Sequence, residues 1–245
     1  MSEYKYFATV YDRMMDDIPY EEWEQYVLLL LCKHGIKPCS KLLELGCGTG
    51  TISGLLTEDG FEVTGIDISE EMLQMAKEKN AKNNINYICH DMRDFSLPEK
   101  HASAISLCDS MNYLLTVDDL ARTMTAVRNN LEPGGIFVFD LKTEHFYMDK
   151  LDGYVFTDDL GDFSYTWKNY YDTEKCIHEY YLKFKIRDDS GYRYEKELHR
   201  QKAFSASEIK EAALRAGFKK AVAYDAFTLD KPKKNSDRIY IVCKG

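Results

Sequence analysis

The spacing of hydrophobic and polar positions changes once along the chain. Between residues 41 and 141, short apolar runs alternate with longer segments in which apolar residues recur every three or four positions. The short runs predict buried strands, and the spacing of three and four predicts helices. Strands that alternate with helices pair in parallel, so this region predicts a doubly wound α/β sheet.

The elements expected in this region follow one another closely. The predicted strands are 41–45, 61–66, 86–89, 102–107 and 135–141, and the predicted helices are 20–34, 49–57, 69–81 and 117–130. A capping box at 205–208 predicts one more helix, which Gly217 ends. Two further strands, 218–227 and 238–243, complete a mostly parallel, doubly wound sheet of seven strands.

A different period follows the fifth strand. Aromatic and aliphatic residues alternate with polar ones over 163–171 and again over 178–186, and a turn is expected at 188–191. Alternation with a period of two predicts an antiparallel sheet. We therefore expect one domain made of residues 1–145 and 205–245, in which 1–35 forms a helical lid. Residues 146–204 are expected to be a small antiparallel β insertion.

Composition places the chain among soluble proteins. It has 245 residues, of which 44% are hydrophobic, and no apolar stretch approaches the roughly 20 residues of a membrane span. The first ten residues lack a basic segment followed by an apolar one, so we expect a cytoplasmic protein without a membrane partner. Its seven cysteines are scattered and never form a CxxC pair, which favours reduced thiols and no metal site.

Charge narrows the range of partners. The net charge is −9, and the most basic block is the stretch 231–234. A protein that binds a phosphate backbone usually presents a basic face. The sequence therefore disfavours a nucleic-acid partner.

A glycine-rich loop follows the first predicted strand. Gly46, Gly48 and Gly50 would let backbone N–H groups and a helix N-terminus approach a ligand. The dinucleotide fingerprint needs a glycine at position 51, where this chain has Thr51. A carboxyl group two residues before the loop, that of Glu44, suits a cationic ligand better than a pyrophosphate.

The next two strands also end in acidic residues. Asp67 lies 21 positions after Gly46, where a carboxylate can accept hydrogen bonds from both ribose hydroxyls. Asp91 could accept from an adenine amino group while Met92 packs on the ring. Each residue has a simpler alternative, since Asp67 could cap a helix, Asp91 could be a loop acid and Met92 could be part of the core.

Together with the stretch 131–135, these motifs resemble class I S-adenosylmethionine (SAM)-dependent methyltransferases over residues 40–141. The resemblance implies a Rossmann-like fold and SAM as cofactor. It also implies that the SAM contacts come from Glu44, Gly46, Cys47, Gly48, Gly50, Asp67, Ile68, Asp91, Met92 and Asp109.

The leader and the fourth strand bear on the methyl acceptor. Residues 6–12 resemble the leader of small-molecule methyltransferases, in which a tyrosine folds over SAM, so Tyr11 is a candidate catalytic residue. Packing of an amphipathic helix is the alternative for Tyr11. Residues 109–113 lack the prolines that enzymes methylating DNA bases and glutamine side chains carry there, which argues against such acceptors.

The insertion supplies the remaining candidates. Its aromatic residues suit a small acceptor with a flat or cationic part, although they could equally pack on the core or pair with a second copy in a homodimer. His199 is expected on the polar face of its strand, between Glu197 and Gln201. It is a candidate general base, and a solvated histidine is the alternative.

These observations predict methyl transfer from SAM to an N or O atom of a small-molecule acceptor. Two alternatives stay open. One is a methyltransferase directed at RNA or protein, and the other is a SAM-binding subunit without activity.

Overall fold

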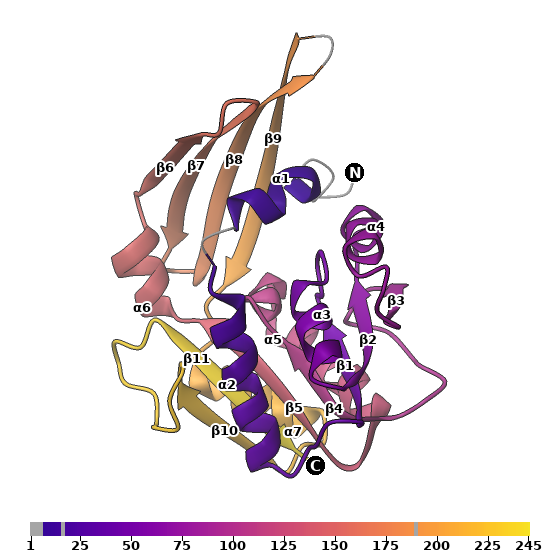
Figure 1. Ribbon diagram of the computed structural model, residues 1–245. Coiled ribbons are helices and arrows are strands. Elements are labelled where there is room, and N and C mark those ends of the chain that lie inside the picture. Colours follow the sequence, from indigo (N-terminus) through magenta and orange to yellow (C-terminus); the bar gives the residue numbers. More distant parts are fainter. Residues whose placement is uncertain (1–6, 16–17, 189–190) are drawn as a thin grey trace.

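Two separate sheets form the framework of the protein (Figure 1). The computed structural model describes residues 7–15, 18–188 and 191–245. Tyr6 of the predicted leader, and Asp189 and Ser190 of the predicted turn, lie outside the described residues. The larger sheet has seven strands in the order β10-β11-β5-β4-β1-β2-β3, and the smaller has four in the order β6-β7-β8-β9.

The larger sheet is the predicted doubly wound one. Its strands are β1 (Lys41–Leu45), β2 (Glu62–Asp67), β3 (Asn86–Cys89), β4 (His101–Ser106), β5 (Leu131–Lys142), β10 (Lys220–Asp225) and β11 (Arg238–Lys244). The first five pair in parallel, and β11 pairs antiparallel with both β5 and β10. This topology confirms the mostly parallel seven-stranded sheet.

Helices cover both faces of this sheet. The described helices are α1 (Phe7–Met14), α2 (Tyr20–Lys33), α3 (Thr51–Glu58), α4 (Glu70–Lys79), α5 (Val117–Asn130), α6 (Glu144–Phe146) and α7 (Ala206–Arg215), with a 3-10 turn η1 (Ser110–Tyr113) and a π-helical turn η2 (Tyr147–Leu151). Of these, α2 and α3 pack on one face of the larger sheet and α5 and α7 on the other. Phe137 and Phe139 of β5 pack toward α5 and α7, whereas Ile136 and Val138 pack toward α2 and α3. Because both faces are buried, the strands are continuous apolar runs that sequence patterning detects.

The structure differs from the prediction at the start of β5 and at the beginning of the insertion. Strand β5 begins at Leu131 instead of residue 135, because the backbone is already extended there and Leu131 pairs with His101. Helix α6, turn η2 and strand β6 (Val155–Asp159) were not expected. All five residues of β6 are exposed, so this edge strand has no alternation of hydrophobic and polar residues that could predict it.

The smaller sheet is antiparallel throughout and confirms the predicted β insertion after the fifth strand. It contains β6, β7 (Phe163–Asp172), β8 (Ile177–Asp188) and β9 (Gly191–Lys202). Its inner face packs against Val10 of α1 and Met72 of α4. In Figure 1, α1 lies between this sheet and α4. The outer face exposes four tyrosines, Tyr170, Tyr181, Tyr192 and Tyr194.

One buried side chain ties the smaller sheet to the larger one. Asn112 of η1 donates from Nδ2 to the backbone oxygens of Lys142, at 3.1 Å, and Lys202, at 2.8 Å. Its Oδ1 accepts from the backbone N–H of Lys142 at 3.0 Å. Lys142 ends β5 and Lys202 ends β9. The chain therefore leaves β5 and returns from β9 at two points held together by one amide.

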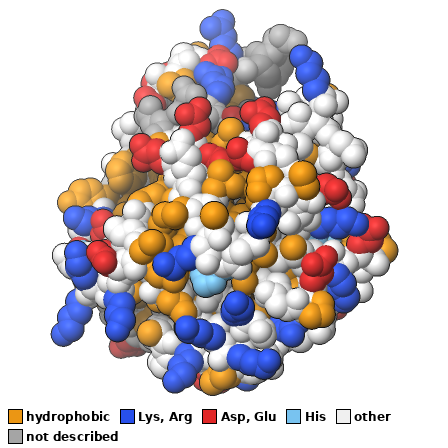
Figure 2. All heavy atoms as spheres, turned by 60° about the horizontal axis from the view of Figure 1, so that its bottom comes forward, with side chains coloured by type: hydrophobic (Ala, Val, Ile, Leu, Met, Phe, Trp, Pro, Cys, Tyr) orange, Lys and Arg blue, Asp and Glu red, His pale blue; other side chains and the backbone are white. Residues whose placement is uncertain are grey.

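Surface charge is not evenly spread. Figure 2 shows Lys and Arg side chains around the lower part of the face turned toward the reader, with hydrophobic side chains near its centre. The net charge of −9 is thus an average over basic and acidic regions. No helix within residues 7–15, 18–188 and 191–245 is long and apolar enough to cross a membrane.

Candidate functional site

A cavity of about 720 Å³ joins the two sheets. On one side it is lined by the residues that follow β1, β2, β3 and β4, at the edge where ligands bind in open α/β sheets. On the other side it reaches the smaller sheet, whose lining residues are Trp167, His178, Tyr180, Leu198, Arg200 and Gln201. The cavity therefore has a half formed by strand-end loops and a half formed by inserted strands.

The glycine loop leaves no room for side chains at two of its positions. Gly46 has φ +66°, and a Cβ atom there would lie 2.7 Å from Cβ of Ser110. Gly50 has φ +73°, and a Cβ atom there would overlap the hydroxyl of Tyr87. Both φ values lie in the left-handed region that favours glycine. The loop can take this shape against η1, β3 and α4 only with glycine at these two positions.

The Asp67 carboxylate holds the glycine loop from the end of β2. It accepts the backbone N–H of Gly48 at 2.8 Å and that of Ser69 at 2.9 Å. Burial raises its pKa, and these backbone hydrogen bonds oppose the rise. Ser69 is the N-cap of α4, since its hydroxyl accepts from the N–H of Met72. Asp67 lines the cavity, as the sequence led us to expect for a cofactor contact.

Two groups beneath the loop are kept uncharged by burial. Glu44 is buried and accepts a hydrogen bond from the hydroxyl of Ser53. Burial raises the pKa of Glu44 to about 8, the Ser53 hydrogen bond lowers it in part, and the nearby Asp67 raises it further. Burial also raises the pKa of the Cys47 thiol well above its ordinary value. A cation in the cavity would favour the ionised form of Glu44.

The part of the cavity near β3 combines a charged pair with apolar side chains. Asp91 accepts from the guanidinium of Arg93 at 2.6 Å and from its backbone N–H at 2.8 Å. The Arg93 hydrogen bond holds the pKa of Asp91 below its ordinary range. Met92 and Ile68 line the cavity beside this pair, and Ile68 is 59% exposed. An apolar side chain this exposed can cover a flat ring.

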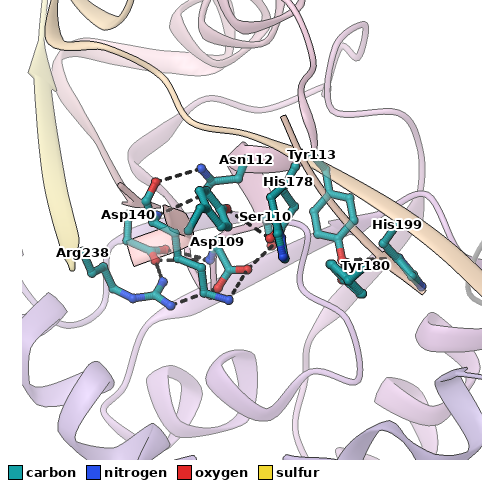
Figure 3. Close-up of polar contacts among 12 residues, drawn as sticks. Asp109, Ser110, Asn112, Tyr113, Asp140, His178, Tyr180, His199 and Arg238 are labelled. Carbon is teal, nitrogen blue, oxygen red and sulfur yellow. Dashed lines mark hydrogen bonds and ion pairs between the residues drawn. The ribbon is translucent and has the colours of Figure 1, made fainter. Parts of the chain in front are cut away.

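Asp109 is the centre of a charged cluster at the junction of the two halves (Figure 3). Its carboxylate contacts Nζ of Lys142 at 3.1 Å, Nη2 of Arg238 at 3.0 Å and Nε2 of Gln201 at 2.7 Å. Burial would raise the pKa of Asp109, but Lys142, Arg238 and Gln201 together outweigh burial and hold it below its ordinary value. The cluster therefore keeps an ionised carboxylate in a buried position.

The backbone beneath this cluster is strained. Cys108 and Asp109 both have positive φ, at 57° and 55°. Such a conformation costs about 1–2 kcal/mol per non-glycine residue. The N–H of Asp109 donates to the buried carboxylate of Asp140, which also pairs with Arg238. These contacts hold the turn in the shape that brings Asp109 to the cavity.

A second polar chain runs from the cavity into the smaller sheet (Figure 3). The hydroxyls of Tyr113 and Tyr180, which both line the cavity, are hydrogen-bonded to each other. Nδ1 of His199 lies 3.4 Å from the Tyr113 hydroxyl, and Nε2 of His199 lies 2.9 Å from Oε2 of Glu197. The His199 ring stacks on Tyr180, with centroids 4.7 Å apart.

The solvated alternative for His199 was wrong. Its side chain is fully buried, and Glu197 and Gln201, on the same side of β9, are also almost inaccessible. The polar side of this strand faces inward because it meets the polar groups around the cavity. His199 does not line the cavity itself and contacts it through Tyr113 and Tyr180.

Helix α1 closes one side of the cavity. Tyr11 lines the cavity, and burial raises the pKa of its hydroxyl well above the ordinary value. Asp12 accepts from the Thr49 hydroxyl of the glycine loop at 2.6 Å and pairs with Lys79 at 2.6 Å. Arg13 pairs at 2.7 Å with Asp162, which lies in the turn between β6 and β7 of the smaller sheet. The leader helix thus contacts both halves of the cavity.

Several cavity residues are not predictable from sequence motifs. Lys142, Arg238 and His178 were not identified, and Gln201 appeared only as a neighbour of His199. One signal could have found two of them. His178 points to the same face of β8 as the buried Tyr180, and Gln201 points to the same face of β9 as the buried His199. Polar residues on a buried face of a strand often line a site. Lys142 and Arg238 are ordinary strand-end residues in sequence.

Comparisons with known proteins agree with this geometry. The family model described as "Methyltransferase domain" matches residues 42–135. The chain is 33% identical over 239 residues to the YqeM protein of Bacillus subtilis (strain 168), whose name assigns it methyltransferase activity provisionally. The match covers 97% of this chain and 95% of that protein.

A solved structure and a shorter match add detail. The structure of an S-adenosylmethionine-dependent methyltransferase from Clostridium acetobutylicum ATCC 824 superposes with a TM-score of 0.81 at 26% identity, covering 98% of both chains. A dTDP-3-amino-3,4,6-trideoxy-alpha-D-glucopyranose N,N-dimethyltransferase of Streptomyces venezuelae is 34% identical over 101 residues. That match covers 41% of this chain and 42% of the other protein.

Proposed function

The chain belongs to the SAM-dependent methyltransferases, and we propose that it transfers the methyl group to a nitrogen or oxygen atom of a small molecule held between the two sheets. The observation that carries this proposal is that one cavity of about 720 Å³ is lined both by residues that follow β1, β2, β3 and β4 and by the smaller sheet. Pockets of about 300–1,000 Å³ are typical of small-molecule sites.

The residues present fit SAM. We assign the amino acid end of SAM to the glycine loop, where Gly46 and Gly48 line the cavity and Glu44 and Cys47 lie beside them. Gly50 does not line the cavity and faces Tyr87 instead. Asp67 then holds the ribose, because its carboxylate lies at the mouth of the loop. The adenine lies near Asp91, between the apolar side chains of Ile68 and Met92. Asp109 marks the passage toward the acceptor.

The chemistry asks little of the protein beyond alignment. SAM, when bound, supplies a methyl group on a sulfonium, which leaves as a neutral thioether without electrophilic help. The protein has to place the acceptor in line and exclude water. Tyr11, Trp167 and Tyr180 supply apolar surface around the acceptor end, and α1 covers the side.

We propose separate roles for the two catalytic candidates. Tyr11 is a lid residue that packs over the donor and acceptor, because it lines the cavity from α1. His199 acts through the hydroxyls of Tyr113 and Tyr180, because its own ring does not line the cavity but contacts these two tyrosines, which do. With Glu197 on its other nitrogen, His199 sets the orientation of those hydroxyls.

A small acceptor is also favoured by what surrounds the cavity. The inserted sheet and α1 cover it, and its acceptor half is lined by Trp167 and Tyr180 rather than by a row of unpaired basic side chains. The Streptomyces venezuelae relative acts, by its name, on an amino sugar nucleotide. That match spans only 41% of this chain, so it supports the acceptor class without naming the acceptor.

A screen with labelled SAM tests the proposal. Purified protein is offered amines, sugars, amino acids, bulk tRNA and a protein mixture, and the incorporated label is measured. We expect label in one or more small molecules. Preferential labelling of tRNA or protein would show that the acceptor is a macromolecule and would contradict the proposed small-molecule acceptor. SAM binding in calorimetry without transfer to any acceptor would favour a non-catalytic subunit.

We also place the activity in the cytoplasm and propose a homodimer contact on the outer face of the smaller sheet. All seven cysteines are free thiols, which suits a reducing compartment. The exposed tyrosines Tyr170, Tyr181, Tyr192 and Tyr194 provide apolar surface for a second copy. Sedimentation of wild type and a Tyr181→Glu variant tests the contact, and a wild-type monomer at all concentrations would refute it.

A further inference from the structure

His178 of β8 is a buried histidine that lines the acceptor half of the cavity. Its side chain is 1% exposed. Its ring stacks on Tyr147, with centroids 4.7 Å apart, and lies beside the ring of Tyr180 at 5.6 Å. The ring is therefore fixed in position by aromatic neighbours. Figure 3 places it beside the Asp109 cluster.

The protonation of this ring follows from its partner. Nε2 of His178 lies 3.0 Å from Oδ1 of Asn169. The Asn169 amide is oriented by its Nδ2, which donates to the backbone oxygen of Tyr154 at 3.1 Å. An amide oxygen can only accept, so Nε2 carries the hydrogen and donates it. Nδ1 of the neutral ring then bears a lone pair.

That lone pair is not used by the protein. Nδ1 of His178 is buried and has no hydrogen-bond partner among the residues that the structure describes. Leaving a buried acceptor without a donor is unfavourable, and such groups in native structures usually serve a ligand or hold a water molecule. The charged groups nearest in the cavity are Lys142 and Asp109, which pair with each other.

We propose that Nδ1 of His178 accepts a hydrogen bond from an N–H of the methyl acceptor and that the acceptor is therefore an amine. This inference rests on the proposed small-molecule function and names the substrate class of the same cavity. His178 is thus a residue that recognises the acceptor and aims its nitrogen, without removing a proton before transfer.

The partner of Nε2 explains why a hydroxyl acceptor fits less well. A hydroxyl oxygen has to lose its proton during transfer, which calls for a general base. A catalytic histidine base usually has a carboxylate on its other nitrogen to stabilise the imidazolium, whereas His178 has a neutral amide. Burial, together with the positive charge of Lys142, lowers the pKa of His178 to about 3, with Asp109 opposing the shift.

An amine needs no base in the transfer step. The lone pair of the neutral nitrogen forms the new bond to the methyl carbon, while the bond from that carbon to sulfur breaks and its electrons stay on sulfur. The positive charge moves to nitrogen, which keeps its hydrogens and leaves as an ammonium. Because N–H becomes a stronger donor as this charge develops, its hydrogen bond to Nδ1 strengthens toward the transition state.

The test uses two substitutions that separate the two ring nitrogens. Glutamine extends its amide to about the position of Nε2, so His178→Gln keeps the donor to Asn169 and loses the group at Nδ1. Asparagine places its amide near the position of Nδ1, so His178→Asn restores an acceptor there. His101→Gln is the matched control, because His101 is also buried with an unpartnered Nδ1 and does not line the cavity.

Each variant is assayed with labelled SAM on matched amine and hydroxyl probes, namely glucosamine and glucose, ethanolamine and ethylene glycol, and glycine and glycolate. We expect wild type to methylate the amine member of a pair. His178→Gln should lower kcat/KM by about tenfold with the SAM Kd unchanged, since one hydrogen bond is lost. His178→Asn should recover most of this loss, and His101→Gln should match wild type.

Three results would overturn the inference. They are a preference for the hydroxyl member of a pair, a His178→Gln variant as active as His101→Gln, and a nitrogen-15 NMR spectrum in which His178 is protonated at Nδ1 between pH 6 and 8. The NMR measurement needs no acceptor. Failure of wild type to methylate any small molecule would instead overturn the proposed function.

Discussion

The two halves of the cavity are built in different ways. The donor half, formed by the loops after β1 to β4, uses strand ends that are close together in sequence. The partners in its central contact, Gly48 and Asp67, are 19 residues apart. The acceptor half joins distant segments, since Asp109 contacts Gln201, 92 residues away, and Arg238, 129 residues away. The donor half also relies on backbone groups, whereas the acceptor half relies on side chains.

This difference separates two tasks within one cavity. A loop whose shape depends on glycines and on the parallel sheet suits one constant ligand, SAM. Side chains on inserted strands can be exchanged without changing that loop, so they suit the part of the reaction that differs between enzymes. Substitutions in one half should therefore change binding of SAM, and those in the other should change turnover of the acceptor.

The largest effect is expected from Asp67→Ala, which tests the donor half alone. The variant loses the carboxylate that holds the loop and that we assign to the ribose hydroxyls. Loss of two charge-assisted hydrogen bonds, together about 3 kcal/mol or more, should weaken SAM binding by at least about 100-fold in calorimetry.

Asp94→Ala is the control for this measurement, because Asp94 is a nearby exposed acid that does not line the cavity. Its SAM Kd should match that of wild type. If Asp67→Ala bound SAM as tightly as Asp94→Ala, the assignment of Asp67 to the ribose would be wrong, and the contrast between the two halves would weaken.

A somewhat smaller effect is expected where the two halves are joined. Asn112→Ala removes three hydrogen bonds and leaves the backbone oxygens of Lys142 and Lys202 without this donor. The free energy of unfolding, measured with denaturant, should fall by about 3 kcal/mol. The control is Asn83→Ala, since the Asn83 amide makes one long contact of 3.5 Å among the described residues, and it should change the free energy of unfolding by less than about 0.5 kcal/mol.

The joining role predicts more than lost stability. The acceptor KM of Asn112→Ala should rise while its SAM Kd stays near that of wild type, because the amide fixes the ends of the inserted sheet and not the glycine loop. An equal increase in the acceptor KM and in the SAM Kd would mean that the two halves of the cavity do not bind their ligands independently.

The smallest effect is a pH dependence within the donor half. Glu44 has a pKa of about 8, so it is mostly protonated at pH 7 and must release its proton to face a cation. SAM affinity should therefore increase as pH rises toward 8, by up to about tenfold per unit. Glu44→Gln should lose the increase in SAM affinity that comes from the titration of Glu44 and keep only the effect of the SAM amino group. Calorimetry at several pH values measures this difference.

The same group gives a stability effect of defined sign. Burial raises the pKa of Glu44 from its ordinary 4.5 to about 8 in the folded protein. Its contribution to stability is fully present below pH 4.5 and is lost as pH rises toward 8, because the unfolded chain then binds fewer protons. In thermal unfolding without SAM, Glu44→Gln should gain stability relative to wild type between pH 5 and 8. A constant difference would contradict this pKa.

The sequence predicts the donor half well for a physical reason. Residues such as Gly46, Asp67 and Asp91 follow strands whose apolar runs are easy to detect, and parallel pairing brings those strand ends together. Patterning therefore placed the strands of the larger sheet to within a few residues, with the start of β5 as the main difference. It missed β6, because an exposed edge strand needs no apolar face.

The acceptor half could be predicted only in part. The alternation of the inserted strands was visible, but the partners of Asp109 depend on the register of β9 and on the place of β11 beside β5. The polar side of β9 carrying His199 suggested exposure to solvent, because a polar phase normally faces water. It is buried since an equally polar set of side chains faces it, and no local pattern contains that information.

The position of Asn112 has a consequence for how such a protein can change in evolution. The chain leaves β5 and returns from β9 at two points held by one side chain, so the two ends of the segment between them have a fixed position on the larger sheet. A sheet that is longer, shorter or differently lined can replace residues 146–204 if its ends still meet that amide. New acceptors can then arise by exchange of one segment while the machinery for the methyl donor is inherited intact.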